Sequence, residues 1–211
     1  MDITWYGHSC FRLRFSCGTV VTDPFAESIG RPPLALAADL VTISHDHPGH
    51  NNAAAVGGAP FVVAGPGEYE AKGIFIVGVR LDHDARAGGH LGHTTAYCIS
   101  ADDLTICHMG DVGHPLSQAQ VEALGAIDVL LLPVGGHRTI GSGIAAEVVS
   151  MLDPALVVPM HFQSAGRPEL EPLDKFLKEM GVAHVEPEEV LKVAGGRLPD
   201  EPQVAVLRAR A

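Results

Sequence analysis

Residues 44–52 read S-H-D-H-P-G-H-N-N and place His45, His47 and His50 within six residues. Imidazole is the commonest side-chain metal ligand near neutral pH, because its neutral ring offers a nitrogen lone pair. Two histidines two residues apart point the same way from an extended chain, and a third, at a turn, approaches from another direction. Gly49 lets the chain turn tightly there. The spacing therefore favours a metal site over a solvated turn, and it suits two adjacent divalent ions better than one.

Short apolar segments dominate the chain and predict an architecture rich in β-strands. The predicted strands span residues 3–7, 10–16, 19–23, 40–43, 61–63, 73–80, 94–100, 104–107, 128–132 and 155–159, with one or two more in 182–211. Predicted helices begin at Asn51 and at the capping box of Ser117 and Gln120, and cover 143–152 and 168–180. Strands followed by alternating strands and helices imply sheets with helices packed on their outer faces.

Metal-capable side chains follow several of the predicted strands directly. They are Asp23, His83, His108 with Asp111, and His161. Side chains that leave neighbouring strands at the same edge of a sheet converge in space even when they are far apart in sequence. We therefore expect them to join the three clustered histidines in one pocket.

The composition indicates a compact, loop-rich globular chain. Its 211 residues are 46% hydrophobic and 18% charged, with 24 glycines and 15 prolines, so we expect a single domain over residues 1–211. The net charge of −11 argues against an extended nucleic-acid surface. A small anionic substrate is still compatible with it, because two bound dications would invert the charge locally.

The apolar runs, the first residues and the cysteine spacing bear on cellular location and on cysteine chemistry. No apolar run approaches the roughly 18 residues of a membrane span. Because residues 3–6 are already strand-like, with no basic or apolar leader before them, a cytoplasmic location is the default expectation. The four cysteines (residues 10, 17, 98 and 107) form no C-x-x-C pair and predict buried, reduced thiols.

Seven motifs, in one order along the chain, resemble the metallo-β-lactamase superfamily and within it the small zinc-dependent hydrolases that include ascorbate-6-phosphate lactonase-like proteins. They are W-Y-G-H-S-C-F at 5–11, T-D-P-F at 22–25, S-H-D-H-P-G-H-N-N at 44–52, G-P-G-E-Y-E at 65–70, H-M-G-D-V-G-H at 108–114, P-V-G-G at 133–136 and P-M-H-F at 159–162. The resemblance covers essentially the whole chain. It implies an α/β fold, the αββα sandwich, with two mixed β-sheets, helices on their outer faces and a dinuclear metal site at one edge.

The resemblance also implies a ligand set. The implied ligands are His45, His47 and His83 for the first metal, His50 and His161 for the second, and Asp111 as the carboxylate that bridges both. Asp23 resembles the buried aspartate behind the cluster, which orients a ligand histidine through a hydrogen bond. His90 and His93, in the glycine-rich loop after His83, are the alternatives to that ligand.

One position departs from the family signature H-x-H-x-D-H, because Gly49 stands where the family has a metal-binding aspartate. The second metal then loses one anionic ligand, and it binds more weakly or takes a ligand from elsewhere. His8 is the preferred substitute, with His108 and His114 as alternatives, and a one-metal enzyme is a further alternative. On this interpretation Gly49→Asp should increase retention of the second metal.

The chemistry expected of such a site is hydrolysis. Two dications about 3.5–4 Å apart lower the pKa of a shared water until hydroxide exists near neutral pH, and this metal-bound hydroxide attacks a carbonyl or phosphorus. Asp111, His161 and His50 would carry the catalytic centre. His137 and Gln163 are candidate substrate contacts, with solvated loop residues as the alternative. Zinc is the expected metal, while manganese, iron and nickel are compatible with the same ligands.

The leading hypothesis is thus a metal-dependent hydrolase of a small ester, lactone or phosphoester. A nuclease or phosphodiesterase of the same fold is the first alternative, and the count of only 14 lysines and arginines argues against it. The second alternative is a non-catalytic metal-binding protein whose second site decayed with Gly49. Sequence does not name the substrate. A second copy of the chain in a homo-oligomer could help to close the cleft.

Overall fold

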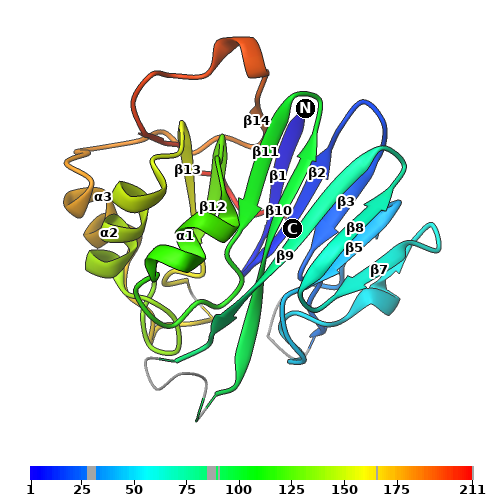
Figure 1. Cartoon of the computed structure of the whole chain (residues 1–211). Coiled ribbons are helices and arrows are strands. Elements are labelled where there is room, and N and C mark those ends of the chain that lie inside the picture. Colours follow the sequence, from blue (N-terminus) through cyan, green and yellow to red (C-terminus); the bar gives the residue numbers. More distant parts are fainter. Residues whose placement is uncertain (28–31, 85–88, 90, 165, 211) are drawn as a thin grey trace.

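Two β-sheets packed face to face form the centre of the molecule (Figure 1). The computed structural model describes residues 1–27, 32–84, 89, 91–164 and 166–210. The first sheet has the spatial order β14 (Leu191–Lys192), β1 (Asp2–Gly7), β2 (Cys10–Arg14), β3 (Thr19–Thr22), β5 (Leu40–Ile43) and β7 (Phe61–Ala64). The second sheet has the order β15 (Gln203–Val204), β13 (Leu156–Met160), β12 (Val129–Pro133), β11 (Leu104–His108), β10 (His93–Ala101), β9 (Ile74–Asp82) and β8 (Gly67–Ala71).

Both sheets are mixed. The first sheet is antiparallel from β14 to β3 and parallel from β3 through β5 to β7. The second is antiparallel from β8 to β11 and parallel from β11 through β12 and β13 to β15. Parallel strands bring their carboxyl ends to one edge of a sheet, and it is at this edge that the candidate ligands leave the strands.

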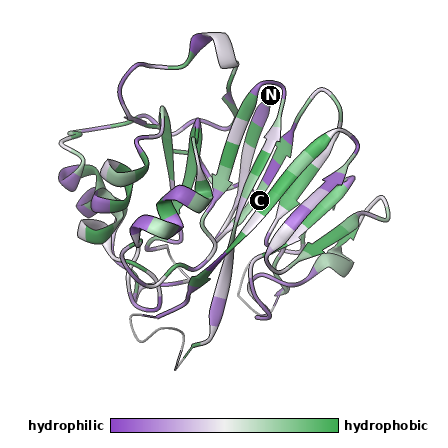
Figure 2. Ribbon diagram, in the orientation of Figure 1, coloured by the Kyte–Doolittle hydropathy of each residue, from purple (hydrophilic) through white to green (hydrophobic). Residues whose placement is uncertain are grey.

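The main core lies between the sheets. Alternate residues of the strands face it, as the two-residue period of a strand requires. Ile3 and Leu13 from the first sheet meet Ile76, Ile99 and Leu131 from the second, and all are fully or almost fully buried. Figure 2 shows hydrophobic residues concentrated along these strands.

A second core lies between the second sheet and the helices α1 (Gln118–Leu124), α2 (Ser142–Leu152) and α3 (Leu173–Glu179). Leu130 of the sheet, Val148 of α2 and Phe176 of α3 belong to it. The capping box of Ser117 and Gln120 begins α1, as the sequence predicts. The hydrophilic stretches of the helices alternate with hydrophobic ones, as expected for helices with one buried side (Figure 2).

The outer face of the first sheet is covered differently. Phe25, the two-stranded ribbon of β4 (Leu36–Ala37) and β6 (Val56–Gly57), and neighbouring residues bury Val21 and Val41 there. Among the described residues this face is covered by the ribbon and by irregular segments, and the three α-helices pack on the second sheet. The predicted helix after Asn51 is a single 3-10 turn, Ala53–Ala55, because a run of three residues is too short to pay for helix nucleation.

Three further predictions differ from the structure. The last long helix begins at Leu173 and not near residue 168, because proline disfavours helical conformation in the residue before it, and Pro172 occupies the N-cap. β8 is a strand that was not predicted from the sequence. Cys17 is exposed, whereas the other three cysteines are buried. None of the helices in the described part of the chain is long and apolar enough to span a membrane.

Candidate metal centre

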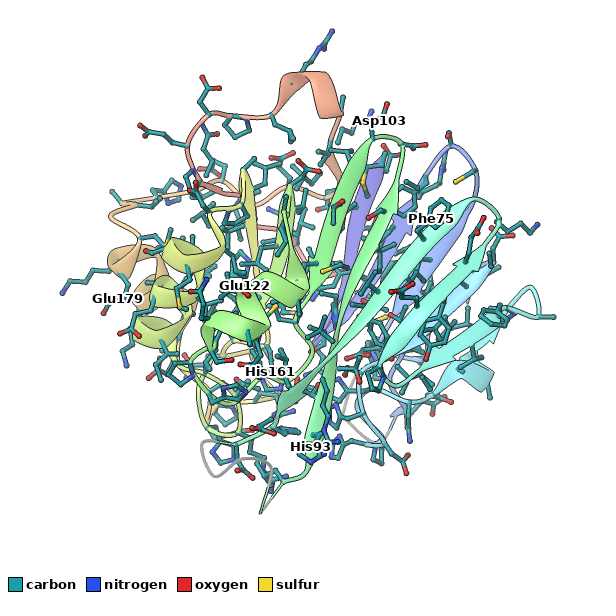
Figure 3. The ribbon with its side chains drawn as sticks, viewed as in Figure 1. Phe75, His93, Asp103, Glu122, His161 and Glu179 are labelled. Atoms are coloured by element: carbon teal, nitrogen blue, oxygen red, sulfur yellow. The ribbon has the colours of Figure 1, made fainter. Side chains whose placement is uncertain are left out.

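The candidate ligands lie at the ends of strands, at one end of the sandwich. His8 follows β1, Asp23 follows β3, His83 follows β9 and His161 follows β13, each as the first residue after the strand. Figure 3 shows His161 towards the lower end of the sheets, with Asp103 and Phe75 at the opposite end. The fold therefore gathers residues from both sheets into one place, as the sequence predicts.

Several of these residues have a backbone conformation that is uncommon outside glycine. His8 (φ 53°), Asp23 (φ 40°), His137 (φ 64°) and His161 (φ 52°) all lie in the left-handed region. Such residues cost of the order of 1–3 kcal/mol each and cluster at functional sites, because the surrounding structure must hold them there. At His8, Asp23 and His161 the chain turns sharply as it leaves a strand, and His137 lies in the turn after β12.

The candidate ligands line a cavity of about 280 Å³, with Asp23 buried behind them. Its lining residues are His8, His45, His47, His50, His83, Asp111, His137, Arg138, His161, Arg167 and Glu169. All six ligands implied by the family resemblance are among them, and so are His8 and His137. Gln163 is not; its side-chain amide donates to the carbonyl of Pro168, 3.0 Å away.

Three groups of potential ligands have their metal-binding atoms within 4.8 Å of one another. They are His8 with His50 and His161, His45 with His83 and Asp111, and His45 with His47 and His50. His47 and His83 each meet His45, but in different groups. The groups share members, so together they form one continuous cluster with room for more than one ion.

Asp111 lies at the centre of the cluster. Its Oδ2 is 3.3 Å from His50 Nε2, 3.6 Å from His161 Nε2 and 3.7 Å from His83 Nε2. Burial would raise the pKa of this carboxyl, but the neighbouring rings of His50 and His161 hold it well below its usual value. Asp111 is therefore an ionised carboxylate that faces members of more than one ligand group.

Asp23 holds two of the histidines from behind. Its Oδ2 accepts a hydrogen bond from His50 Nδ1 (2.7 Å) and one from Ser44 Oγ (2.5 Å). A serine hydroxyl has one proton to donate, so Ser44 Oγ accepts from His45 Nδ1, 3.0 Å away. One buried carboxylate thus fixes the rings of His50 and His45, and leaves Nε2 of each to face the cavity.

The charges fit a cation at the centre. Burial alone would lower the pKa of His50, but the carboxylates of Asp111 and Asp23 raise it to about 10. A proton therefore stays on this ring between two anions, where a metal ion would supply positive charge in its place. The pKa of His45 falls to about 4, mainly through burial and then through the charge of His50. Its ring is neutral at pH 7, as a metal ligand requires.

Two imidazole nitrogens in the cluster have no hydrogen-bond partner. They are His8 Nε2 and His161 Nδ1, and both are buried. A buried polar atom left unpaired costs about 1–3 kcal/mol, so it calls for an explanation. Burial and the neighbouring histidines also lower the pKa of His8. A metal ion would satisfy His8 Nε2. His161 instead turns its other nitrogen, Nε2, towards Asp111 at 3.6 Å.

His8 fills the space that the family's aspartate side chain would need. A Cβ atom placed on Gly49 would lie 2.8 Å from His8 Nε2 and 3.1 Å from His47 Nδ1. The turn at His8 is held by its own carbonyl, which accepts from Trp5 Nε1 at 3.1 Å. The expectation that Gly49→Asp alone would improve metal retention therefore conflicts with the structure, because the new side chain would collide with His8.

The other histidines named as alternative ligands do not belong to the three ligand groups, and two of them use both ring nitrogens in hydrogen bonds to other residues. His108 donates from Nε2 to the Ser9 carbonyl (2.8 Å) and accepts at Nδ1 from Gly110. His114 accepts at Nε2 from the Asp82 amide and donates from Nδ1 to the Pro115 carbonyl. His93 pairs with the side chain of Asp82. His90 lies outside the described residues.

Glycines behind the site let the backbone pass close to two candidate ligands. A Cβ on Gly135 would lie 2.1 Å from the carbonyl oxygen of His161, and one on Gly113 would lie 2.3 Å from that of His83. No side chain fits at such distances. The glycines in P-V-G-G and H-M-G-D-V-G-H are therefore steric requirements of the site.

The sequence did not single out three residues of the cavity, namely Arg138, Arg167 and Glu169. Arg138 directly follows His137 in the G-G-H-R turn, and its carbonyl accepts from His83 Nδ1 at 3.1 Å. Arg167 and Glu169 pair with each other at 2.6 Å. A basic residue in a glycine-rich turn after a buried strand was the one available signal, and it is a weak one.

Comparisons with known proteins identify the family of this chain. A family model described as a β-lactamase superfamily domain matches residues 2–161. A UPF0173 metal-dependent hydrolase of Pyrococcus horikoshii is 30% identical over 194 residues, which cover 78% of this chain and 85% of the relative. One from Thermococcus kodakarensis is 31% identical with the same coverage.

Among solved structures, a candidate Zn-dependent hydrolase of the metallo-β-lactamase superfamily from Thermotoga maritima is 38% identical. It matches with a TM-score of 0.81, over 98% of this chain and 97% of that one. The chain therefore belongs to the metallo-β-lactamase superfamily, and within it to the UPF0173 family of metal-dependent hydrolases. The predicted superfamily and its fold are confirmed, and the family together with the His and Asp cluster supports divalent metal binding. The narrower likeness to ascorbate-6-phosphate lactonase stays a prediction.

Proposed function

We propose that this chain binds two divalent metal ions in the cavity and hydrolyses a small ester, lactone or phosphoester there. The observation that carries the proposal is the ring of imidazoles around one carboxylate oxygen, Asp111 Oδ2, which has three of them within 3.7 Å. A pair of ions bridged by a carboxylate needs such an arrangement, with neutral nitrogen donors on either side.

The two ions divide the ligands as follows. His8, His50 and His161 form one buried group and would hold the second ion. The first ion would take the family's three histidines, His45, His47 and His83, and Asp111 would bridge. Nitrogen-rich sets of this kind favour zinc over calcium or magnesium, with manganese as the alternative.

When bound, such ions lower the pKa of a coordinated water and polarise the bond to be cleaved. The chain's own residues supply the rest. Asp23 and Ser44 keep the rings of His50 and His45 in one orientation, which limits the rearrangement needed during a reaction cycle. Asp111 stays ionised and would hold the first-metal and second-metal ligands at a fixed distance from each other.

The structure favours this function over the two alternatives. Decay of the second site would leave a gap at Gly49, but His8 Nε2 occupies that space with a metal-capable atom. A nuclease needs a basic surface that follows a backbone, whereas the chain is acidic and the cavity measures only about 280 Å³. The proposed substrate is accordingly a small molecule.

The test combines metal content with turnover. We expect about two equivalents of zinc per chain after reconstitution and removal of excess metal, together with hydrolysis of at least one member of a panel of chromogenic esters, lactones and phosphoesters. His161→Ala should lower both readouts. The matched control is His184→Ala, since His184 is exposed and pairs with Glu186. Two bound ions without any turnover would point to the metal-binding alternative, and retention on heparin at low salt would point to the nuclease.

A further inference from the structure

The cavity carries positive charge beyond its metal ligands. Arg138 and Arg167 both line it, in a chain whose net charge is −11. Arg167 is neutralised by Glu169 at 2.6 Å. Among the described residues no acidic group pairs with the Arg138 guanidinium, and its main chain is held beside the cluster by the hydrogen bond from His83. Of the two arginines in the described lining, Arg138 is therefore the one without an acidic partner.

The proposed centre is also more cationic than the family signature would make it. Exchanging an aspartate at position 49 for the neutral imidazole of His8 keeps a ligand but removes one negative charge. The described acidic side chains of the lining are Asp111 and the paired Glu169. Two dications with one bridging carboxylate and a free guanidinium leave a surplus of positive charge that a bound anion can neutralise.

From these charges we propose that the substrate of this site carries an oxyanion group, a phosphate or a carboxylate, which the Arg138 guanidinium binds next to the metal centre. The inference rests on the proposed hydrolase function and names its substrate class. Guanidinium forms paired, charge-assisted hydrogen bonds with both kinds of oxyanion. The cavity volume of about 280 Å³ lies just below the usual range for drug-sized ligands, so the anion belongs to a small metabolite-sized molecule.

Arg138 and Arg167 reach the cavity from different elements. Arg138 follows the turn after β12, and its main chain is tied to the cluster because its carbonyl accepts from His83 Nδ1. Arg167 follows β13 and is paired with Glu169. The anionic end of the substrate should therefore lie towards Arg138, the arginine without an acidic partner among the described residues.

Binding tests the inference without relying on turnover. Isothermal titration of the zinc-loaded protein with inorganic phosphate and with glutarate would be compared across wild type, Arg138→Gln and Arg138→Lys. We expect Arg138→Gln to weaken the preferred anion about tenfold, and Arg138→Lys to weaken it less. Which of the two anions binds more tightly identifies the phosphate or the carboxylate as the natural group. The control is Arg197→Gln, which removes the same charge from the 3-10 turn Gly195–Arg197 at the other end of the molecule (Figure 1).

The second test compares the rates at which matched neutral and anionic esters are hydrolysed. 4-Nitrophenyl valerate and the 4-nitrophenyl monoester of glutaric acid share a leaving group and a chain length, and differ by a methyl against a carboxylate. The ratio of their kcat/KM values should favour the anionic ester in wild type and fall about tenfold in Arg138→Gln. 4-Nitrophenyl phosphate serves the same purpose for phosphate.

The outcomes separate the two proposals. If Arg138→Gln behaves like Arg197→Gln in both assays, or if neither anion binds the wild type, the anionic substrate class is wrong even when neutral esters are cleaved. If Arg138→Gln weakens anion binding but no substrate is hydrolysed, the anion-binding role of Arg138 stands and the hydrolase function fails.

Discussion

Replacing His8 with alanine should uncouple metal binding from the stability of the metal-free fold. His8 is buried, its backbone is held in the left-handed region, and its Nε2 has no partner. A residue with these properties contributes little to the free energy of unfolding of the metal-free protein. If it is a ligand of the second ion, its contribution appears when the metal is bound.

The magnitudes follow from two opposing effects in the metal-free protein. Truncating a buried ring leaves a cavity and loses packing worth about 1–3 kcal/mol. Removing the unpaired Nε2 recovers a similar amount, about 1–3 kcal/mol. The free energy of unfolding of metal-free His8→Ala should therefore lie within about 1 kcal/mol of wild type. Loss of a ligand should weaken the second zinc at least 10- to 100-fold, or about 1.4–2.7 kcal/mol.

Position 49 completes a double-mutant cycle. Gly49→Asp alone places its Cβ 2.8 Å from His8 Nε2, and relieving that contact should cost about 1–3 kcal/mol with no gain in metal affinity. In the His8→Ala background the contact with His8 is gone. The remaining contact, with His47 Nδ1 at 3.1 Å, needs only a small shift, so the aspartate can supply the missing ligand. The same substitution should then raise zinc affinity, so the coupling between the two positions exceeds about 1 kcal/mol.

The assays are urea unfolding in the presence of a chelator and zinc affinity by competition with a chromophoric chelator, on all four members of the cycle. Equal affinity for the second zinc in wild type and His8→Ala would refute the ligand role. So would a gain in affinity from Gly49→Asp in the wild-type background, because it would mean that His8 does not occupy the site.

Three further predictions concern the framework of the site. Gly135→Ala should destabilise the fold by at least about 1–3 kcal/mol in urea unfolding, because its Cβ would lie 2.1 Å from the carbonyl oxygen of His161. The control is Gly143→Ala in helix α2, where an added Cβ would meet no neighbouring atom within 4 Å, and which should stabilise the fold by about 0.5–1 kcal/mol. Similar effects of the two substitutions would refute the steric argument. Asp23→Asn should lower zinc affinity 10- to 100-fold while the far-UV circular dichroism stays native, and unchanged affinity would show that this carboxylate does not orient the ligands. Ser117→Ala should cost about 1 kcal/mol of stability through loss of the capping box and leave zinc stoichiometry untouched, so a loss of metal would contradict a purely local role.

Local patterns in the sequence locate most of the strands and most of the cavity residues. Short apolar segments rich in β-branched residues mark the strands other than the short ones and β8, and strand ends locate Asp23, His83 and His161. These signals are short-range and need no knowledge of the tertiary fold. The seven motifs add the order in which the pieces come together, which local patterns cannot supply.

What could not be predicted depends on contacts between segments far apart in sequence. The clash of an aspartate at position 49 with His8 joins residues 41 positions apart, and it exists only because the turn after β1 folds over the histidine turn. The place of Arg138 in the cavity is likewise not predictable from sequence, because it depends on how the turn after β12 packs against the cluster. The absence of a described helix over the first sheet follows from how the segments around Phe25 and β4 pack, which local propensity does not determine.

The exchange of ligands at positions 8 and 49 has a consequence for chemistry as well as for packing. An imidazole in place of a carboxylate keeps the number of donors, but it donates less charge to the ion and leaves the ion a stronger Lewis acid. A centre of this kind should favour anions, whereas an aspartate at the same place would repel them. Arg138, which has no acidic partner among the described residues, adds to that preference. Restoring the aspartate in the His8→Ala background should therefore weaken phosphate or glutarate binding even as it strengthens zinc binding, and a parallel gain in both would show that ligand charge does not control anion affinity.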